Sequence, residues 1–180
     1  MPADLSTAIA DLSSPEPERR AAAALTLAEL GSGARPAAVP LVRAAADDDE
    51  STAQAATAAV DSLGPPDAAD APALLELLAA VPPVEDNPSA RDQAFWAMTL
   101  LARLGPHGPH VAPFTEELLR RLESPADYEI QRRALRVTAM LGASDPRIVR
   151  AVERLASGDD PRISAAAQRA RASLQGGAGS

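Results

Sequence analysis

Two kinds of helix boundary recur at one period along this chain, and this doubled repeat limits the folds that it can adopt. Leu-Gly pairs end at Gly31, Gly64, Gly105 and Gly142, which lie 33, 41 and 37 residues apart. A glycine just past a helix end adopts the left-handed conformation without a steric penalty, and a nearby proline keeps the helix from continuing. A proline follows each of these glycines within a few residues. The pattern therefore predicts four helix ends at nearly regular intervals.

Helix starts recur in the same register. They are marked by a short acidic or amide side chain, in most cases followed by proline: Glu16-Pro17, Asp49-Glu50, Asn87-Pro88, Asp127-Tyr128 and Asp160-Pro161, spaced by 33, 38, 40 and 33 residues. The first residue of each pair can accept hydrogen bonds from the N–H groups of the next turn, which have no partner within the helix. Proline at the first helical position costs no hydrogen bond, because an N–H there would also lack a partner within the helix. Because starts and stops share one period, the chain is built from internal repeats.

A second helix fits between each glycine and the next helix start, where apolar residues follow helical spacing. The sequence thus predicts five helix pairs: 3–12 with 17–30, 36–46 with 51–63, 70–81 with 88–104, 109–123 with 127–141, and 146–157 with 161–174. No segment has the pattern of a strand. Each pair leaves an apolar face uncovered, so neighbouring pairs must stack to form one continuous core.

The predicted fold class is all-α, a right-handed α-α superhelix (solenoid) of about five helix pairs in a single domain at 1–175. Its repeats fall at about 2–32, 33–65, 66–106, 107–143 and 144–175, and the Gly-rich residues 176–180 are expected to be a flexible tail. Composition supports this class: 46% of the residues are hydrophobic but only 2% are aromatic. A core of Ala, Leu and Val suits closely packed helices better than a β-sandwich.

Composition also excludes some classes of protein. The chain has no cysteine, so it has no disulfides, thiolate metal sites or cysteine nucleophiles. No apolar run reaches the roughly 18 residues that a membrane span needs, and no signal peptide is visible. We therefore expect a cytoplasmic protein with no membrane partner. All 17 basic residues are arginine, a bias that we expect from a GC-rich bacterial genome.

The stretches from Glu16 to Gly31 and from Asp160 to Ala167 resemble HEAT repeats, particularly the short bacterial type of the phycobilisome lyases. The second helix of that family typically begins Asp-Pro-x-Val-Arg and ends Ala-Leu-Gly. The resemblance covers nearly the whole chain. It implies that the first helices of the pairs line the convex side of the solenoid and the second helices the concave side. Armadillo repeats, which have three helices each, stay open as an alternative.

The resemblance also implies a ladder of Asp–Arg pairs between neighbouring repeats. The arginine of the family matches Arg20 and Arg91, whereas Ala53, Gln131 and Ser164 stand at the other three equivalent positions. We therefore expect this ladder to be weak or broken.

Catalytic, metal-binding and cofactor-binding patterns are sparse. The chain contains no Gly-x-Ser-x-Gly turn and no phosphate-binding loop. His107 and His110 could supply two metal ligands, but two ligands do not make a site, so we expect a solvated turn there. The acidic run 47–50 straddles a helix boundary, where it is expected to cap the next helix rather than hold a cation. The sequence thus predicts no catalytic residues, no metal and no cofactor.

Charge is distributed unevenly. The net charge is −8, yet residues 1–90 hold 4 arginines against 15 acidic residues, whereas residues 91–180 hold 13 against 10. Arg136 and Arg169 occupy equivalent positions in adjacent repeats, where stacking would place them side by side. Arginines of the preceding helices are expected to carry charge on the opposite side: Arg120, Arg121, Arg147, Arg150 and Arg154.

An arginine row beside an aromatic ring would suit an anionic partner, because the guanidinium fork matches a carboxylate and a tryptophan can anchor a peptide. The candidate partner-binding residues are Arg132, Arg136, Arg169, Arg162 and Trp96. Two alternatives compete with this interpretation. The arginines could merely keep an Ala-rich helix soluble, and Phe95 and Trp96 could both pack in the core.

The favoured function is a non-catalytic protein–protein interaction scaffold that binds a protein or peptide partner with an acidic segment on its concave face. A nucleic-acid-binding HEAT-repeat protein is an alternative, which the charge of −8 opposes. A lyase-like accessory subunit is a further alternative, for which no residue marks a chromophore site.

Overall fold

The computed structural model describes residues 5–83, 86–124, 127–141 and 145–176, which form ten α-helices and no strand. The helices are α1 (Leu5–Asp11), α2 (Pro17–Leu30), α3 (Ala38–Ala44), α4 (Glu50–Ser62), α5 (Ala71–Ala80), α6 (Pro88–Arg103), α7 (Val111–Leu122), α8 (Tyr128–Leu141), α9 (Pro146–Ala156) and α10 (Pro161–Gly176). Short 3₁₀-helices, Gly31–Ala37 and Ala68–Asp70, lead into α3 and α5. The predicted helix pairs are confirmed. The expected tail lies outside the described residues, apart from Gly176 at the end of α10.

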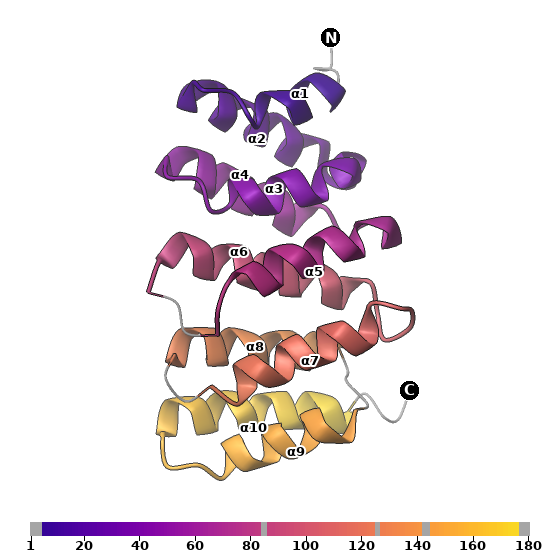
Figure 1. Cartoon of the computed structure of the whole chain (residues 1–180), viewed down its shortest axis with the longest axis vertical. Helices are drawn as coiled ribbons and strands as arrows, with labels where there is room; N and C mark the ends of the chain where they lie inside the picture. The colour runs from indigo at the N-terminus through magenta and orange to yellow at the C-terminus, as the bar shows by residue number, and fades with distance from the viewer. Residues whose placement is uncertain (1–4, 84–85, 125–126, 142–144, 177–180) are drawn as a thin grey trace.

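The helix pairs stack into a two-layered solenoid, with the first and last pairs at opposite ends of the stack (Figure 1). The second helices form one layer, in which α2 packs on α4, α6 on α8 and α8 on α10. The first helices form the other layer, in which α5 packs on α3 and α7, and α7 on α9. The all-α solenoid that the repeats predict is therefore confirmed. No helix within the described residues is long and apolar enough to cross a membrane.

The predicted caps are confirmed at most helix boundaries. Gly64 and Gly105 end their helices with φ of 74° and 87°, the left-handed region that glycine enters without strain. Gly142 lies outside the described residues. At the helix starts, the Asp49 carboxylate accepts a hydrogen bond from the Thr52 N–H at 2.8 Å. Glu16 differs, because its side chain makes no capping hydrogen bond to α2.

The core is built from alanine and leucine along the whole solenoid. Phe114 on α7 is fully buried, whereas Phe95, Trp96 and Tyr128 are only partly buried against the core. The two adjacent aromatics of α6 therefore both pack, yet neither is enclosed. This leaves aromatic surface accessible on the layer of second helices.

One predicted surface arginine belongs to the interior. Arg121 of α7 is 0% exposed, and burial lowers the pKa of its guanidinium. Its Nη2 donates to the carbonyls of Leu78 and Val81, at 2.6 and 2.7 Å, and its Nη1 donates to the Glu117 carboxylate. Helix α5 ends there, where the Leu78 carbonyl also accepts the Val81 N–H at 3.2 Å. The expectation that Arg121 adds surface charge was wrong, because this side chain caps a buried helix end instead.

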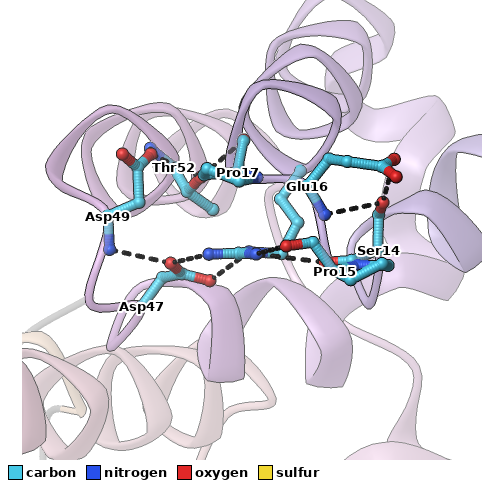
Figure 2. A network of polar contacts seen from close by, with 8 residues as sticks. Ser14, Pro15, Glu16, Pro17, Asp47, Asp49 and Thr52 are labelled. Atoms are coloured by element: carbon cyan, nitrogen blue, oxygen red, sulfur yellow. Dashed lines mark hydrogen bonds and ion pairs between the residues drawn. The ribbon is translucent and has the colours of Figure 1, made fainter.

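The ladder between repeats has a pair at the first junction. The Arg20 guanidinium holds Asp47 with two hydrogen bonds of 2.7 Å, from Nε to Oδ2 and from Nη2 to Oδ1. Figure 2 shows this network, with Asp47 on one side and Ser14 and Pro15 on the other. The bonds from Arg20 are the main cause that lowers the pKa of the Asp47 carboxyl. The first two repeats are thus joined by a charged pair at the helix starts.

A second ladder arginine forms a salt bridge at the third junction, where Arg91 Nη2 lies 3.1 Å from Oδ2 of Asp127. The partner here is the residue that caps the next helix, whereas Arg20 binds Asp47, two residues before the cap Asp49. The equivalent position holds Ala53 in the second repeat and Gln131 in the fourth, and neither side chain carries a charge. The ladder is therefore broken into two separate pairs, as the sequence predicts. The second and third repeats are joined instead at the other end of their helices, where Arg103 Nη1 donates to the Val60 carbonyl at 2.9 Å.

The ladder position has a second role within the first, fourth and fifth repeats. Arg20 also donates to the carbonyl of Ser14, at 3.0 Å. The Gln131 amide donates to the Leu122 carbonyl at 2.7 Å, and the Ser164 hydroxyl donates to the Ala156 carbonyl at 2.7 Å. Each of these carbonyls lies at or just past the end of the first helix of its pair. The position thus ties the two helices of one pair together even where no ladder pair forms.

Asp70, just before α5, gives the fold a testable pH dependence. Its Oδ2 is buried without a hydrogen-bond partner among the described residues, and burial is the main cause that raises the pKa of its carboxyl. We expect Asp70→Asn to raise Tm at pH 7, because the fold disfavours the ionised carboxylate. The folded wild type binds this proton more readily than the unfolded chain, so wild-type stability recovers as the pH falls through the raised pKa.

The gain in Tm from Asp70→Asn should therefore shrink between about pH 7 and about pH 4, as thermal unfolding followed by circular dichroism would show. Asp67→Asn is the control. Asp67 is exposed and its carboxylate accepts a hydrogen bond from the Ala69 N–H at 2.9 Å. This change removes only the repulsion between the two carboxylates, so it should raise Tm by less than Asp70→Asn does. A gain from Asp70→Asn that persists unchanged at the lower pH would contradict the assignment.

Candidate partner-binding face

The even-numbered helices from α4 to α10 carry a row of open cavities, and we call this surface the second-helix face. The central one, the aromatic cavity, has a volume of about 210 Å³. Its lining residues come from α4, α6 and α8: Thr57, Asp92, Phe95, Trp96, Arg132, Arg133 and Arg136. It thus joins two aromatic rings to three arginines.

Contacts among these side chains order the aromatic cavity. The rings of Phe95 and Trp96 meet edge to face, with centroids 5.0 Å apart. The guanidinium carbons of Arg133 and Arg136 lie 5.3 and 5.6 Å from the centroid of Phe95, within the range of a cation–π interaction. Arg133 also pairs with the Asp92 carboxylate. The rings are thus held in place, while part of their surface stays open.

The arginine cavity lies next to it, between α8 and α10, with a volume of about 250 Å³. Arg132, Arg136 and Arg169 line it, together with small residues such as Ala166 and Ala170, and no acidic residue lines it. Arg132 pairs with Glu129 at 2.8 Å. Arg136 and Arg169 are exposed and form no salt bridge within the described ranges. Their guanidinium groups are therefore available to an anion.

The acidic cavity lies on the other side of the aromatic cavity, between α4 and α6, with a volume of about 470 Å³. Four acidic residues line it and no arginine does: Asp47, Asp48, Glu50 and Asp92. It shares Thr57 and Asp92 with the aromatic cavity, which in turn shares Arg132 and Arg136 with the arginine cavity. The three cavities therefore form one continuous surface.

Four of the five candidate residues lie on this surface, since Trp96, Arg132, Arg136 and Arg169 all line its cavities. Arg162 lies apart from them. Its guanidinium sits 4.3 Å from the centroid of the Tyr128 ring and binds Asp160 at 3.0 Å. It is exposed, but it does not extend the arginine row.

Sequence analysis missed Arg133 and Asp92 as parts of the site. A signal for Arg133 was present, because alanine stands at the equivalent position in three other repeats, as Ala22, Ala55 and Ala166. An arginine where a repeat otherwise has alanine needs a partner that the repeat itself does not supply. Here that partner is Asp92 on the preceding second helix.

The histidine turn differs from its prediction. His107 is exposed, but His110 is only 6% exposed, and its Nε2 lies 3.3 Å from the Gly105 carbonyl oxygen. The expectation of a solvated turn was therefore wrong for His110, which packs back on the end of α6. Within the described ranges, no group of three or more His, Asp or Glu residues could hold a metal ion.

The opposite side of the solenoid also carries arginines, but acidic residues accompany them. A cavity of about 550 Å³ between α7 and α9 is lined by Arg120, Arg147, Arg150 and Arg154 together with Glu116 and Glu123. Arg147 pairs with Glu116 at 2.6 Å, and Arg154 pairs with Glu123 at 3.1 Å. These pairs link neighbouring first helices across the surface, so less positive charge is left for a partner than in the arginine cavity.

Comparison with known proteins finds similarity in structure rather than in sequence. No protein-family model and no curated protein matches the chain. A designed armadillo repeat protein in complex with the peptide (KR)4 is 18% identical, with a TM-score of 0.59 over 94% of this chain and 81% of that protein. An engineered protein is 19% identical, with a TM-score of 0.57 over 95% of this chain, which spans only 47% of that longer protein.

An archaeal HEAT-like repeats protein from Thermococcus onnurineus NA1 is 14% identical, with a TM-score of 0.43 over 96% of this chain and 87% of that protein. Identities this low establish the fold alone. In its fold, this chain is therefore a helical repeat solenoid, similar to a designed armadillo repeat protein.

Proposed function

We propose that this protein is a non-catalytic interaction scaffold, which binds an acidic segment of a protein or peptide partner on its second-helix face. The observation that carries the proposal is the open junction of the aromatic and arginine cavities, where Arg136 lies between Trp96 and Arg169. Guanidinium forks bind carboxylates in two-point contacts, and a tryptophan ring supplies apolar area for a neighbouring side chain.

Two further observations support this choice of face. Two of the four arginines that line the opposite cavity, Arg147 and Arg154, are paired across neighbouring helices with Glu116 and Glu123. In the arginine cavity, Arg136 and Arg169 form no salt bridge within the described ranges, and no acidic residue lines that cavity. A designed armadillo repeat protein of similar fold binds a peptide. The fold is therefore compatible with peptide binding, and the residues of this chain select the face and the charge of the ligand.

Nucleic acid is the alternative occupant of this surface, because bases stack on aromatic rings and phosphates bind arginine. The acidic cavity lies on the same continuous surface, and the net charge is −8. Both would repel a phosphate backbone that runs along the face. An acidic peptide that engages only the arginine end avoids this repulsion.

The test replaces Arg132, Arg136 and Arg169 together by glutamate. Each exposed charge pair contributes up to about 1 kcal/mol, and the changes also add repulsion, so we expect the affinity for a labelled peptide of glutamates around a central leucine to fall at least tenfold. Fluorescence anisotropy gives the affinity. Trp96 is the only tryptophan, so its emission should shift when the wild type binds at this cavity.

A matched control changes Arg147, Arg150 and Arg154 on the opposite side to glutamate, which alters the net charge equally. We expect this variant to bind the peptide within about twofold of the wild type. Equal loss in both variants would mean that the peptide responds only to net charge. Tighter binding of single-stranded DNA than of the acidic peptide, with the same dependence on the three arginines, would favour the nucleic-acid alternative.

A further inference from the structure

The missing ladder arginine leaves an opening between the second and third repeats. Arg20 fills the equivalent space at the first junction, where it neutralises Asp47. In the second repeat this position holds Ala53, which lines the acidic cavity beside Pro88 and Ser89. Arg103 joins these two repeats at the far ends of α4 and α6, through the Val60 carbonyl. The junction is therefore closed at one end and open, without a basic side chain, at the other.

The two ends of the second-helix face consequently carry opposite charge. In the acidic cavity, Arg20 pairs with Asp47 and Arg133 pairs with Asp92, so Asp48 and Glu50 retain uncompensated negative charge. Asp48 is exposed, and among the described residues Glu50 accepts a hydrogen bond only from the neutral Gln54 amide. In the arginine cavity, Glu129 compensates Arg132, which leaves the positive charges of Arg136 and Arg169.

An ion pair marks the boundary between the acidic and the basic end of the second-helix face. Asp92 on α6 and Arg133 on α8 form an ion pair, and both line the aromatic cavity between the two charged ends. Phe95 lies under Arg133 and Arg136 in the same cavity. Along the face, the order is therefore acidic, aromatic, basic, and each part shares lining residues with the next.

We infer that the partner segment is bipolar, with basic residues over the acidic cavity, an apolar residue at Phe95 and Trp96, and acidic residues over Arg136 and Arg169. This inference rests on the proposed function and adds the basic half of the ligand. Adjacent packed helices lie about 8–10 Å apart, so the four helices from α4 to α10 span roughly 24–30 Å. An extended chain of about eight or nine residues, at about 3.3 Å per residue, covers that span.

The charge order also selects against other occupants. A uniformly acidic strand would meet Asp48 and Glu50 at one end, and a uniformly basic one would meet Arg136 and Arg169 at the other. Like charges brought together in this way lower affinity. A bipolar segment gains attraction at both ends, and only in one orientation along the face.

The test compares three labelled peptides of equal length. The first has a basic block, a central leucine and an acidic block; the second has serines in place of the basic block; the third has the composition of the first with the charges alternating. Two added charge pairs of up to about 1 kcal/mol each should make the first bind about tenfold tighter than the second. The alternating peptide should lose this gain, because its charges no longer match the two ends.

Variants of the protein test whether the acidic cavity causes the tighter binding of the first peptide. Ala53→Arg places a basic side chain in the acidic cavity and should remove the preference for the first peptide, whereas Ala53→Met, of similar bulk but without charge, should keep more of it. Asp48→Asn combined with Glu50→Gln removes the charge without adding bulk and should also abolish the preference. None of these changes should alter binding of the serine peptide by more than about twofold.

The outcomes separate this inference from the proposed function. If the first and second peptides bind equally, while binding of both still depends on Arg132, Arg136 and Arg169, the acidic cavity has no role and the inference is overturned, but the proposed function stands. If the arginine changes leave binding of the second peptide intact, the proposed function itself is overturned. Absence of binding by all three peptides would overturn both.

Discussion

Replacement of Arg121 by methionine is expected to lower the free energy of unfolding by about 3 kcal/mol, although this residue lies in a helix that the sequence marks as a charged surface. Its guanidinium is 0% exposed and donates to the carbonyls of Leu78 and Val81 at the end of α5. Methionine keeps the apolar bulk but removes one charge-assisted hydrogen bond from each carbonyl, and bonds to a charged group contribute about 1.5–3 kcal/mol each. Arg121 Nε has no partner among the described residues, so we place the expected loss near the lower end of that range.

Arg120→Met is the matched control, because Arg120 is the neighbouring residue and bonds the same glutamate. Its Nη1 donates to Glu117 Oε1 at 2.7 Å, but its side chain is 53% exposed. We expect a loss below about 1 kcal/mol for this exposed pair. Urea unfolding of both variants, followed by far-UV circular dichroism, measures the difference. Similar losses would show that Arg121 contributes as a surface charge rather than as a buried cap.

Asp127→Ala is expected to lower the free energy of unfolding by about 2–4 kcal/mol. The Asp127 side chain is buried, and its Oδ1 accepts a hydrogen bond from the Ile130 N–H at 3.1 Å. Its Oδ2 meets Arg91 across the third junction. Alanine removes the helix cap and leaves a half-buried arginine without this partner, so the loss should exceed that of a cap alone.

Asp49→Ala separates these two contributions. Asp49 caps α4 through the Thr52 N–H, but the ladder arginine of this junction, Arg20, forms its salt bridge with Asp47 and not with Asp49. We expect its loss to be that of a helix cap, about 1 kcal/mol. Equal losses for the two variants, measured by urea unfolding, would mean that the ladder pair adds no stability and that only the capping hydrogen bond matters.

The failure of prediction at Arg121 and His110 has a single physical cause. His110 follows a glycine–proline link, and Arg121 lies on a helix rich in charged residues. In both places the local sequence pattern indicates solvent exposure. Their burial depends on backbone carbonyls at the end of a neighbouring helix, those of Leu78 and Val81 for Arg121 and that of Gly105 for His110. Helical period does not reveal where such carbonyls lie, because the end of each helix relative to its neighbour is set only when the repeats stack.

The candidate site was likewise predicted in part, and the rest depends on how the repeats stack. Equivalent positions in the repeat placed Arg136 and Arg169 side by side, and both line one cavity. Arg162 was grouped with them because it stands on the same predicted helix as Arg169, but its guanidinium lies over the Tyr128 ring and does not line the cavity. The ion pair of Arg133 with Asp92 joins residues 41 positions apart, which is longer than one regular repeat, so no local pattern could connect them.

The sequence by itself determined the helix pairs, their caps and the broken ladder, because each depends on residues within one repeat period. Glycine and short acidic side chains act within a turn or two of the helices that they end or begin. The tertiary structure alone decided which arginines are buried, paired or open, because these depend on the distance and rotation between neighbouring repeats. The order of acidic, aromatic and basic cavities on the second-helix face is of this second kind, since each cavity forms between helices of different repeats.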